Sequence, residues 1–145
     1  DRVAIRGWSF GGYLAALAVL RRPDVFHAAV AGAPVTDWTL YDTHYTERYL
    51  GHPDQEPEGY RRSSPLTFAS ELRRPLLLIH GFADDNVIVA HTLRMSSALT
   101  TAAIPHEVAL IPGSHMGGAD EVVVSRYLLE LEFLRRSLGL AAPAA

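Results

Sequence analysis

Short apolar runs alternate with helix-forming segments along this sequence of 145 residues. The runs are continuously apolar, which favours strands that are covered on both faces of a parallel sheet. Strict alternation of strand and helix is typical of the α/β class. We therefore predict a mostly parallel sheet of about four strands with flanking helices. The expected strands are residues 3–6, 27–35, 76–80 and 107–111.

The segments between these runs predict the flanking helices, at residues 13–22, 66–72, 89–102 and 120–137. Residues 38–51 are rich in aromatic side chains, and a spacing of four predicts that Tyr41, Tyr45 and Tyr49 share one helical face. Residues 52–65 contain three prolines and predict a loop or a broken helix. The last helix carries an apolar stripe that we expect to face the core, namely Val124, Tyr127, Leu128, Leu131, Leu134 and Leu138.

The composition excludes several classes of protein. There is no cysteine, so a disulfide scaffold and a Cys-based zinc or redox site are excluded. The formal net charge of −3 argues against a nucleic-acid partner, which needs clustered positive charge. No apolar run reaches the roughly 18 residues of a membrane span, and residues 1–7 do not resemble a signal peptide. Nothing in the sequence calls for a metal or a cofactor.

The pattern G-x-S-x-G occurs at residues 7–11, between the first expected strand and helix. By composition alone this pattern arises by chance in roughly one chain in twenty of this length. Its place between strand and helix is that of the nucleophile turn of α/β-hydrolases, which holds a serine at the carboxyl end of the sheet. The plainer alternative is a glycine-rich turn with an incidental serine.

A serine nucleophile needs an imidazole to take its proton and an acid to hold the imidazole. In α/β-hydrolases these partners follow the serine in the order acid, then histidine. Asp84 and Asp85 follow the third expected strand, and His115 follows the fourth. Ser9 and His115 are therefore the predicted nucleophile and base, while spacing alone does not choose between the two aspartates. His80, at the end of the third expected strand, is expected to be packed and hydrogen-bonded. The remaining histidines are expected to be structural or solvated: His27, His44, His52, His91 and His106.

Three motifs resemble the prolyl oligopeptidase family of serine peptidases, in its dipeptidyl peptidase IV branch. They are GWSFGGY at residues 7–13, APVTDW at 33–38 continued by YDTHYTERYLG at 41–51, and HGFADDNV at 80–87. The resemblance extends from residue 3 to residue 138. It implies that residues 1–140 are the C-terminal half of an α/β-hydrolase domain, and we expect residues 141–145 to be a disordered tail.

The resemblance also implies roles for individual residues. Asp84 becomes the acid, Asp85 caps the following turn, and the backbone N–H of Phe10 binds the oxyanion. Asn86 binds a carbonyl group of the substrate. The remaining matches form an apolar pocket for proline, made by Tyr41 and Tyr45 and completed by Trp38, Val35 and Val87. Tyr49 is expected in the core. The family's pair of glutamates, which lies in an N-terminal propeller, and a tyrosine that helps bind the oxyanion have no match in these residues.

These motifs predict a serine peptidase that hydrolyses peptides after proline, or after alanine, through an acyl-enzyme. Two alternatives remain open, an esterase or lipase of the same fold and a non-catalytic assembly fragment. A second oxyanion donor comes from an earlier loop in this fold. We therefore expect the isolated 145 residues to be nearly inactive. The expected partners are a peptide substrate and either the propeller with the first half of the hydrolase domain or a second copy of the chain.

Overall fold

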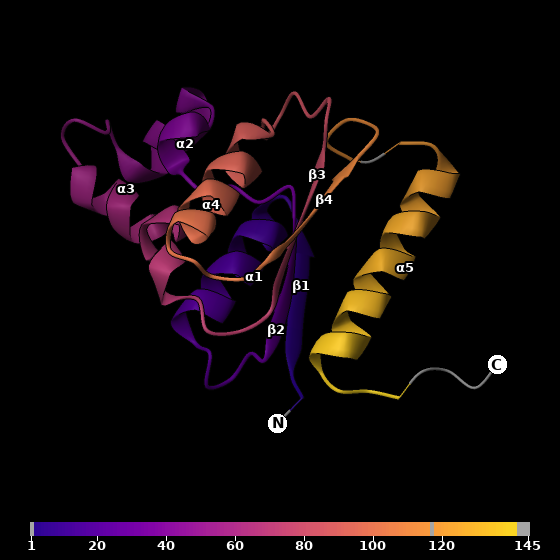
Figure 1. Cartoon of the computed structure of the whole chain (residues 1–145). Helices are drawn as coiled ribbons and strands as arrows, with labels where there is room; N and C mark the ends of the chain where they lie inside the picture. The colour runs from indigo at the N-terminus through magenta and orange to yellow at the C-terminus, as the bar shows by residue number, and fades with distance from the viewer. Residues whose placement is uncertain (1, 117, 142–145) are drawn as a thin grey trace.

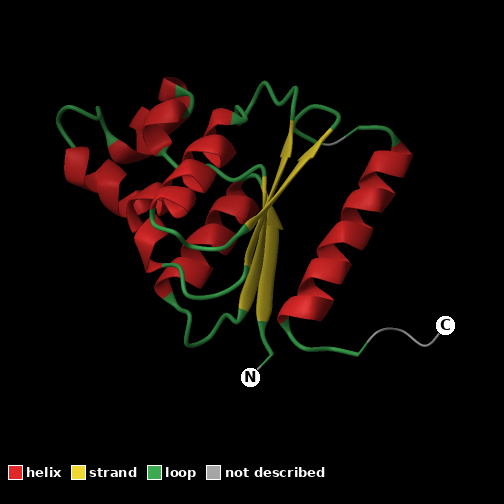
Figure 2. Ribbon diagram, in the orientation of Figure 1, coloured by secondary structure: helices red, strands yellow, loops and turns green. Residues whose placement is uncertain are grey.

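The computed structural model describes residues 2–116 and 118–141, which form a four-stranded sheet between two layers of helices (Figure 1, Figure 2). The strands are β1 (Ala4–Trp8), β2 (Ala28–Gly32), β3 (Leu76–Gly81) and β4 (Glu107–Ile111). Each strand pairs in parallel with the next one along the chain. All carboxyl ends therefore lie at one edge of the sheet. The prediction of a parallel sheet of about four strands is confirmed.

Helices cover both faces of this sheet, which explains the continuous apolar runs. Leu76 and Leu78 of β3 point into one apolar cluster, and Leu77 and Ile79 point into the other. The first cluster includes side chains from α1, η2 and α4, and the second is closed by Phe133 of α5. The bounds of these elements are α1 (Phe10–Arg21), η2 (Pro65–Glu71), α4 (Ala90–Thr101) and α5 (Asp120–Ser137). Figure 1 shows α5 alone on its side of the sheet.

The predicted helical face of Tyr41, Tyr45 and Tyr49 is interrupted. A 3₁₀ turn, η1 (Trp38–Leu40), is followed by a separate helix, α2 (Thr43–Leu50), and Tyr41 lies between them. Two aspartates cause the break, because the Asp37 side chain accepts from the N–H of Thr39 and the Asp42 side chain accepts from the N–H groups of His44 and Tyr45. Such side-chain caps begin a new helix.

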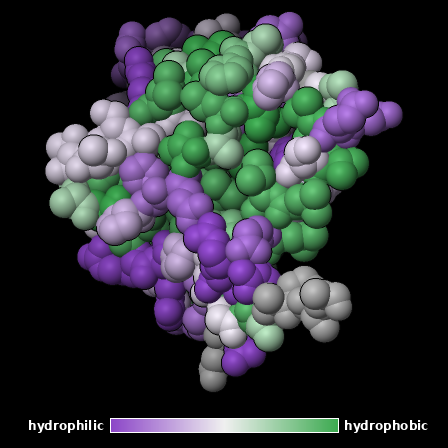
Figure 3. Space-filling view, turned by 45° about the vertical axis from the view of Figure 1, so that its right-hand side comes forward, coloured by the Kyte–Doolittle hydropathy of each residue, from purple (hydrophilic) through white to green (hydrophobic). Residues whose placement is uncertain are grey.

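The predicted core-facing stripe of α5 is largely wrong. Leu128 and Leu131 are 61% and 62% exposed, and Val124 is 58% exposed. The face that meets the sheet instead carries Phe133 together with two charged residues, Arg126 and Glu130, which are buried. Only Leu134 and Leu138 of the stripe pack against the core. Figure 3 brings the α5 side of the molecule forward and shows a broad apolar patch there.

Smaller differences concern segment ends. β2 ends at Gly32, three residues before the predicted end, because Ala33 adopts a left-handed conformation with φ 41°. The predicted loop or broken helix at residues 52–65 contains a two-turn helix, α3 (Pro57–Ser63). Of the predicted tail at residues 141–145, residues 142–145 lie outside the described residues. Among the residues described, no helix is both long and apolar enough to cross a membrane.

Candidate active site

Ser9 occupies a strained turn between β1 and α1. Its backbone has φ 59° and ψ −121°, a conformation that a non-glycine residue adopts only where the surrounding structure enforces it. A Cβ atom on Gly7 would lie 2.2 Å from the carbonyl oxygen of Gly11, so the turn is too tight for a side chain there. The Ser9 N–H donates to the carbonyl of Gly32 on β2 (2.9 Å), which ties the turn to the sheet. The turn thus presents the Ser9 hydroxyl at the carboxyl edge.

His115 reaches Ser9 from the loop after β4. Its Nε2 lies 2.8 Å from Ser9 Oγ although the two residues are 106 positions apart. The same loop is fastened to the loop after β3, because the N–H of Ala83 donates to the carbonyl of Gly113 (3.0 Å) and the N–H of Phe82 to that of Ile111 (3.0 Å). Adjacent parallel strands therefore bring the two loops together at one edge.

Asp84 completes the arrangement from the loop after β3. Its Oδ2 lies 2.8 Å from His115 Nδ1, and its Oδ1 accepts from the N–H groups of Asn86 (3.0 Å) and Val87 (2.9 Å). These bonds orient the buried carboxylate. The cap predicted for Asp85 is made by Asp84 instead, and the Asp85 side chain is exposed. Local hydrogen bonding thereby selects between the two aspartates.

His80, at the end of β3, lies behind this loop. Its Nε2 lies 2.7 Å from the carbonyl of Val87, and a carbonyl only accepts, so Nε2 carries the proton. Its Nδ1 then accepts from the Thr92 hydroxyl (2.7 Å). Burial lowers the pKa of His80, in keeping with this neutral form. The prediction that His80 is a packed, hydrogen-bonded residue is confirmed, and its contact with Val87 braces the loop that carries Asp84.

The residues predicted for the proline pocket gather beside Ser9. Trp38 packs against two tyrosine rings that also contact each other, edge-on to Tyr41 (5.8 Å between centroids) and stacked on Tyr45 (6.1 Å). Val35 and Val87 pack with Trp38 in one buried cluster. The Tyr41 hydroxyl donates to Asn86 Oδ1 (3.1 Å), so the two predicted substrate contacts meet directly. Burial raises the pKa of the Tyr41 phenol, which stays protonated at neutral pH.

A cavity of about 390 Å³ opens between α1 and α2 on this side of the molecule. The predictions named two of its walls, Trp38 and Tyr45, and missed the others, which include the side chains of Phe10, Tyr13 and Tyr49. Tyr49 was expected in the core and is 68% exposed. Its spacing of four from Tyr45 indicated that the two tyrosines would line the same side of the cavity, and their ring centroids lie 5.0 Å apart.

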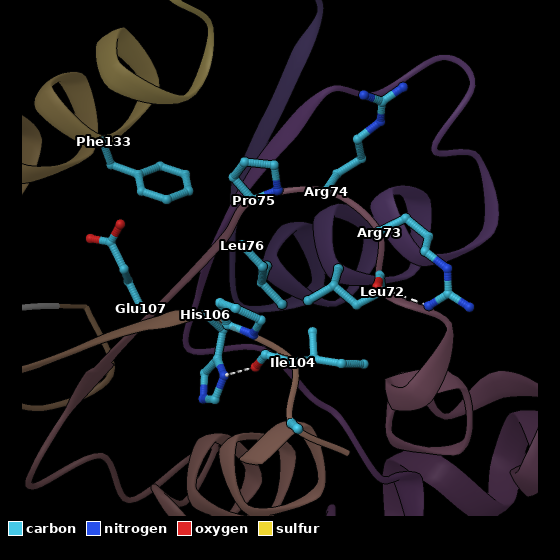
Figure 4. A pocket seen from close by; sticks show the side chains of 11 residues that line it. Leu72, Arg73, Arg74, Pro75, Leu76, Ile104, His106, Glu107 and Phe133 are labelled. Carbon is cyan, nitrogen blue, oxygen red and sulfur yellow. Dashed lines mark hydrogen bonds between the residues drawn. The ribbon is translucent and has the colours of Figure 1, made fainter. Parts of the chain in front are cut away.

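A second cavity, of about 450 Å³, lies at the opposite edge of the sheet, where β3 and β4 begin (Figure 4). Figure 4 shows Phe133 of α5 and Glu107 on one side and Arg73 and Arg74 on the other, with Pro75, Leu76 and His106 between them. None of the predicted site residues lines it. Within residues 2–116 and 118–141, no group of three or more His, Cys, Asp or Glu side chains is placed to hold a metal ion.

Phe10, whose N–H is the predicted oxyanion donor, is the first residue of α1 and follows Ser9 directly. The N-terminus of a helix presents unpaired N–H groups and a partial positive charge to an anion. The first turn of α1 has no acidic side chain to cancel that charge. The helix end therefore suits a negative charge forming beside the Ser9 hydroxyl.

Comparison with known proteins gives matches along nearly the whole chain. A family model described as the prolyl oligopeptidase family matches residues 1–141. The chain is 52% identical over 144 residues to dipeptidyl peptidase 8 of Homo sapiens, covering 96% of the chain and 16% of that protein. It is 42% identical over 106 residues to dipeptidyl peptidase 4 of Bos taurus, covering 71% of the chain and 14% of that protein. The crystal structure of Porphyromonas gingivalis dipeptidyl peptidase 4 superposes with a TM-score of 0.89 at 38% identity, covering 92% of this chain and 19% of that one.

These matches confirm the resemblance that the three motifs indicate and the α/β-hydrolase character of the fold. The chain spans only about a sixth of the length of the dipeptidyl peptidase 8 that it matches.

Proposed function

The chain belongs to the prolyl oligopeptidase family, and from that premise we propose that Ser9, His115 and Asp84 act together as the triad of a dipeptidyl peptidase-type serine peptidase. The observation that carries the proposal is the pair of 2.8 Å contacts, from Ser9 Oγ to His115 Nε2 and from His115 Nδ1 to Asp84 Oδ2. A nucleophile hydrogen-bonded to a base, which is in turn hydrogen-bonded to an orienting acid, is the arrangement that acyl transfer by a serine requires.

The chemistry follows from this geometry. Ser9 Oγ attacks the substrate carbonyl while its proton moves to His115 Nε2, and Asp84 stabilises the resulting imidazolium through Nδ1–H. The Phe10 N–H binds the developing oxyanion. His115 then gives its proton to the leaving amine, which departs and leaves an acyl-enzyme on Ser9. Water deprotonated by His115 attacks that ester, and the proton returns to Ser9 as the acid product leaves.

The aromatic pocket supports cleavage after proline, or after alanine. A proline ring is apolar and has no N–H, so it suits the aromatic walls of the cavity between α1 and α2, which include Trp38 and Tyr45. Tyr41 packs edge-on against Trp38, and the buried Val35 and Val87 support Trp38 from the core. Because the Tyr41 hydroxyl donates to Asn86 Oδ1, the Asn86 amide nitrogen is turned toward other acceptors. We assign it to a carbonyl of the substrate.

The 145 residues by themselves should turn over peptides slowly. Their one proposed oxyanion donor is the Phe10 N–H, and loss of a second donor costs roughly 10²–10³ in rate. The test compares kcat of this chain with kcat of the complete natural protein on an Ala-Pro substrate. Equal rates would contradict this part of the proposal.

Fluorophosphonate labelling of the complete protein tests the triad, because the reagent reacts only with an activated serine. We expect labelling at Ser9 that is abolished in Ser9→Ala and lost in His115→Ala. Ser96→Ala is the matched control, since Ser96 bonds His106 near the start of β4, at the other edge of the sheet. Labelling that survives His115→Ala would refute the triad. Hydrolysis of short acyl esters but not of Ala-Pro substrates would favour an esterase.

A further inference from the structure

Trp8, which precedes Ser9, makes a second connection between the nucleophile turn and the base. Its indole Nε1–H donates to the backbone carbonyl of His115, with 2.6 Å between the heavy atoms. The His115 side chain contacts Ser9 and Asp84, whereas this bond holds the backbone of the same residue. The base is therefore held at both its ring and its main chain.

Two further contacts restrict the indole and hence the direction of its N–H. One is with β2, where a Cβ atom on Gly32 would be 2.0 Å from Trp8 Cε3, so the ring rests against a glycine backbone. The other is with the Arg126 guanidinium, which lies over the ring, 4.3 Å from its centroid. A cation at this distance over an indole is attracted to it.

Arg126 is itself held in place by two neighbours on α5, the half-exposed Tyr127 and the buried Glu130. It is 7% exposed, and its guanidinium also lies 4.7 Å from the Tyr127 ring. Glu130 is 3% exposed, lies 3.6 Å from Arg126 Nε and also accepts from Arg6 of β1 (2.7 Å). Burying charges is costly unless they serve as partners to one another. The ion pair between Glu130 and Arg6 thus connects α5 to β1, the strand that carries Trp8.

The loop that carries His115 gives a reason for such a brace. It contains Gly113 with φ 117° and further glycines, so little in its own sequence stiffens it. A base that moves by about 1 Å can cost on the order of 10²-fold in rate. A hydrogen bond from the restricted indole to the backbone of the base reduces that freedom.

We propose that Trp8 is a positioning residue for His115, acting through its indole N–H, and that Arg126 keeps the indole in the required plane. This inference rests on the proposed function and adds to it two residues, which act through the base and not on the substrate.

The test uses the complete natural protein and Trp8→Phe, which removes the N–H and leaves an aromatic ring beside Gly32 and Arg126. We expect kcat per fluorophosphonate-titrated site to fall about 10- to 100-fold, with KM for an Ala-Pro substrate within about twofold of the parent value. The rate of fluorophosphonate labelling should fall in parallel, since it depends on Ser9 and His115 but not on the proline pocket. Ser96→Ala serves as the control and should leave all three quantities unchanged.

Arg126→Met repeats the test from α5 without altering the nucleophile turn, and it covers the case in which Trp8→Phe does not fold. We expect a smaller decrease of kcat, about 3- to 10-fold, partly recovered in Arg126→Lys, whose ammonium also attracts the ring.

The outcomes separate the two levels of inference. If fluorophosphonate does not label the parent protein, the proposed function is overturned, and the role of Trp8 with it. Labelled, active parent protein with an unchanged kcat in Trp8→Phe overturns the positioning role alone. A raised KM with an unchanged labelling rate would instead make Trp8 a substrate contact, and so would also overturn it.

Discussion

At the scale of single residues, the site depends on buried polar groups that satisfy one another. Asp84 uses one carboxylate oxygen for His115 and the other for two backbone N–H groups. His80 behind it bonds Val87 and Thr92. An unpaired buried polar group costs about 1–3 kcal/mol. Removing one member of this set would therefore destabilise the fold, because its buried hydrogen-bond partners would be left unsatisfied. The acid loop is therefore held by hydrogen bonds and not by apolar packing alone.

His91 makes stability depend on pH. It is fully buried, its Nδ1 accepts from the N–H of Thr36 (3.2 Å), and burial lowers its pKa from 6.5 to about 4. The unfolded chain then binds a proton that the folded chain does not, so this contribution is complete above pH 6.5 and is lost as the pH falls toward 4. We predict a loss of about 2–3 kcal/mol in the free energy of unfolding between pH 7.5 and pH 4.5 from this residue.

Urea unfolding at the two pH values measures this effect. His91→Asn is the matched variant, because its amide oxygen replaces Nδ1 as acceptor and does not titrate. The pH dependence of the variant should be flatter than that of the parent by this amount. Parallel curves for the two proteins would contradict the prediction.

At the scale of elements, short polar caps decided where helices begin. The Asp37 and Asp42 side chains divide the aromatic segment into η1 and α2 and leave Tyr41 between them. This break turns Tyr41 toward Asn86, where a continuous helix would have placed it in line with Tyr45 and Tyr49. The pocket thus depends on a helix start as much as on the aromatic residues.

Asp42→Ala should accordingly affect both stability and substrate binding. We expect about 1 kcal/mol lower stability, which is typical for loss of a helix cap. We also expect a raised KM for Ala-Pro substrates, because the Tyr45 N–H loses the carboxylate oxygen that anchors it. Thermal unfolding and steady-state kinetics on the complete protein measure the two effects. Asp54→Ala is the control, since Asp54 is exposed and lies outside the pocket. A KM equal to that of the control would remove Asp42 from the pocket's construction.

At the scale of the whole molecule, the outer face of α5 is apolar and unusually exposed. Val124, Leu128 and Leu131 all lie more than half exposed on one side of this helix. Apolar patches of this kind mark surfaces that contact other proteins or other parts of a chain. β1 and β4 are also the two outermost strands of the sheet described here, each with one side that has no neighbouring strand in it. These features support the proposed self-association of the 145-residue chain.

We predict that this chain associates as its concentration rises and that Leu128→Glu with Leu131→Glu shifts it toward the monomer, because a charge on the apolar face opposes its burial. Analytical ultracentrifugation over a range of concentrations measures the change. Leu129→Glu is the matched control, because Leu129 is also exposed on α5 but points about 100° away from Leu128. A parent chain that stays monomeric throughout would contradict the prediction.

The sequence by itself determined the class of fold and the location of the site. Continuous apolar runs and helix-forming segments are local properties, so they predicted four parallel strands and put Ser9, the aspartate pair and His115 at strand ends. Neighbouring parallel strands end at one edge, and for that reason topology alone was enough to gather residues 9, 84 and 115.

Only the tertiary structure decided which partner each side chain met. The apolar periodicity of α5 indicated one face, but Arg126 and Glu130 turned another face inward because Trp8 and Arg6 on β1 supply their partners. Likewise, two backbone N–H groups oriented Asp84 and left Asp85 exposed. The bond from Trp8 to His115 spans 107 residues. Such contacts depend on how distant segments pack together, and no pattern along the chain encodes them.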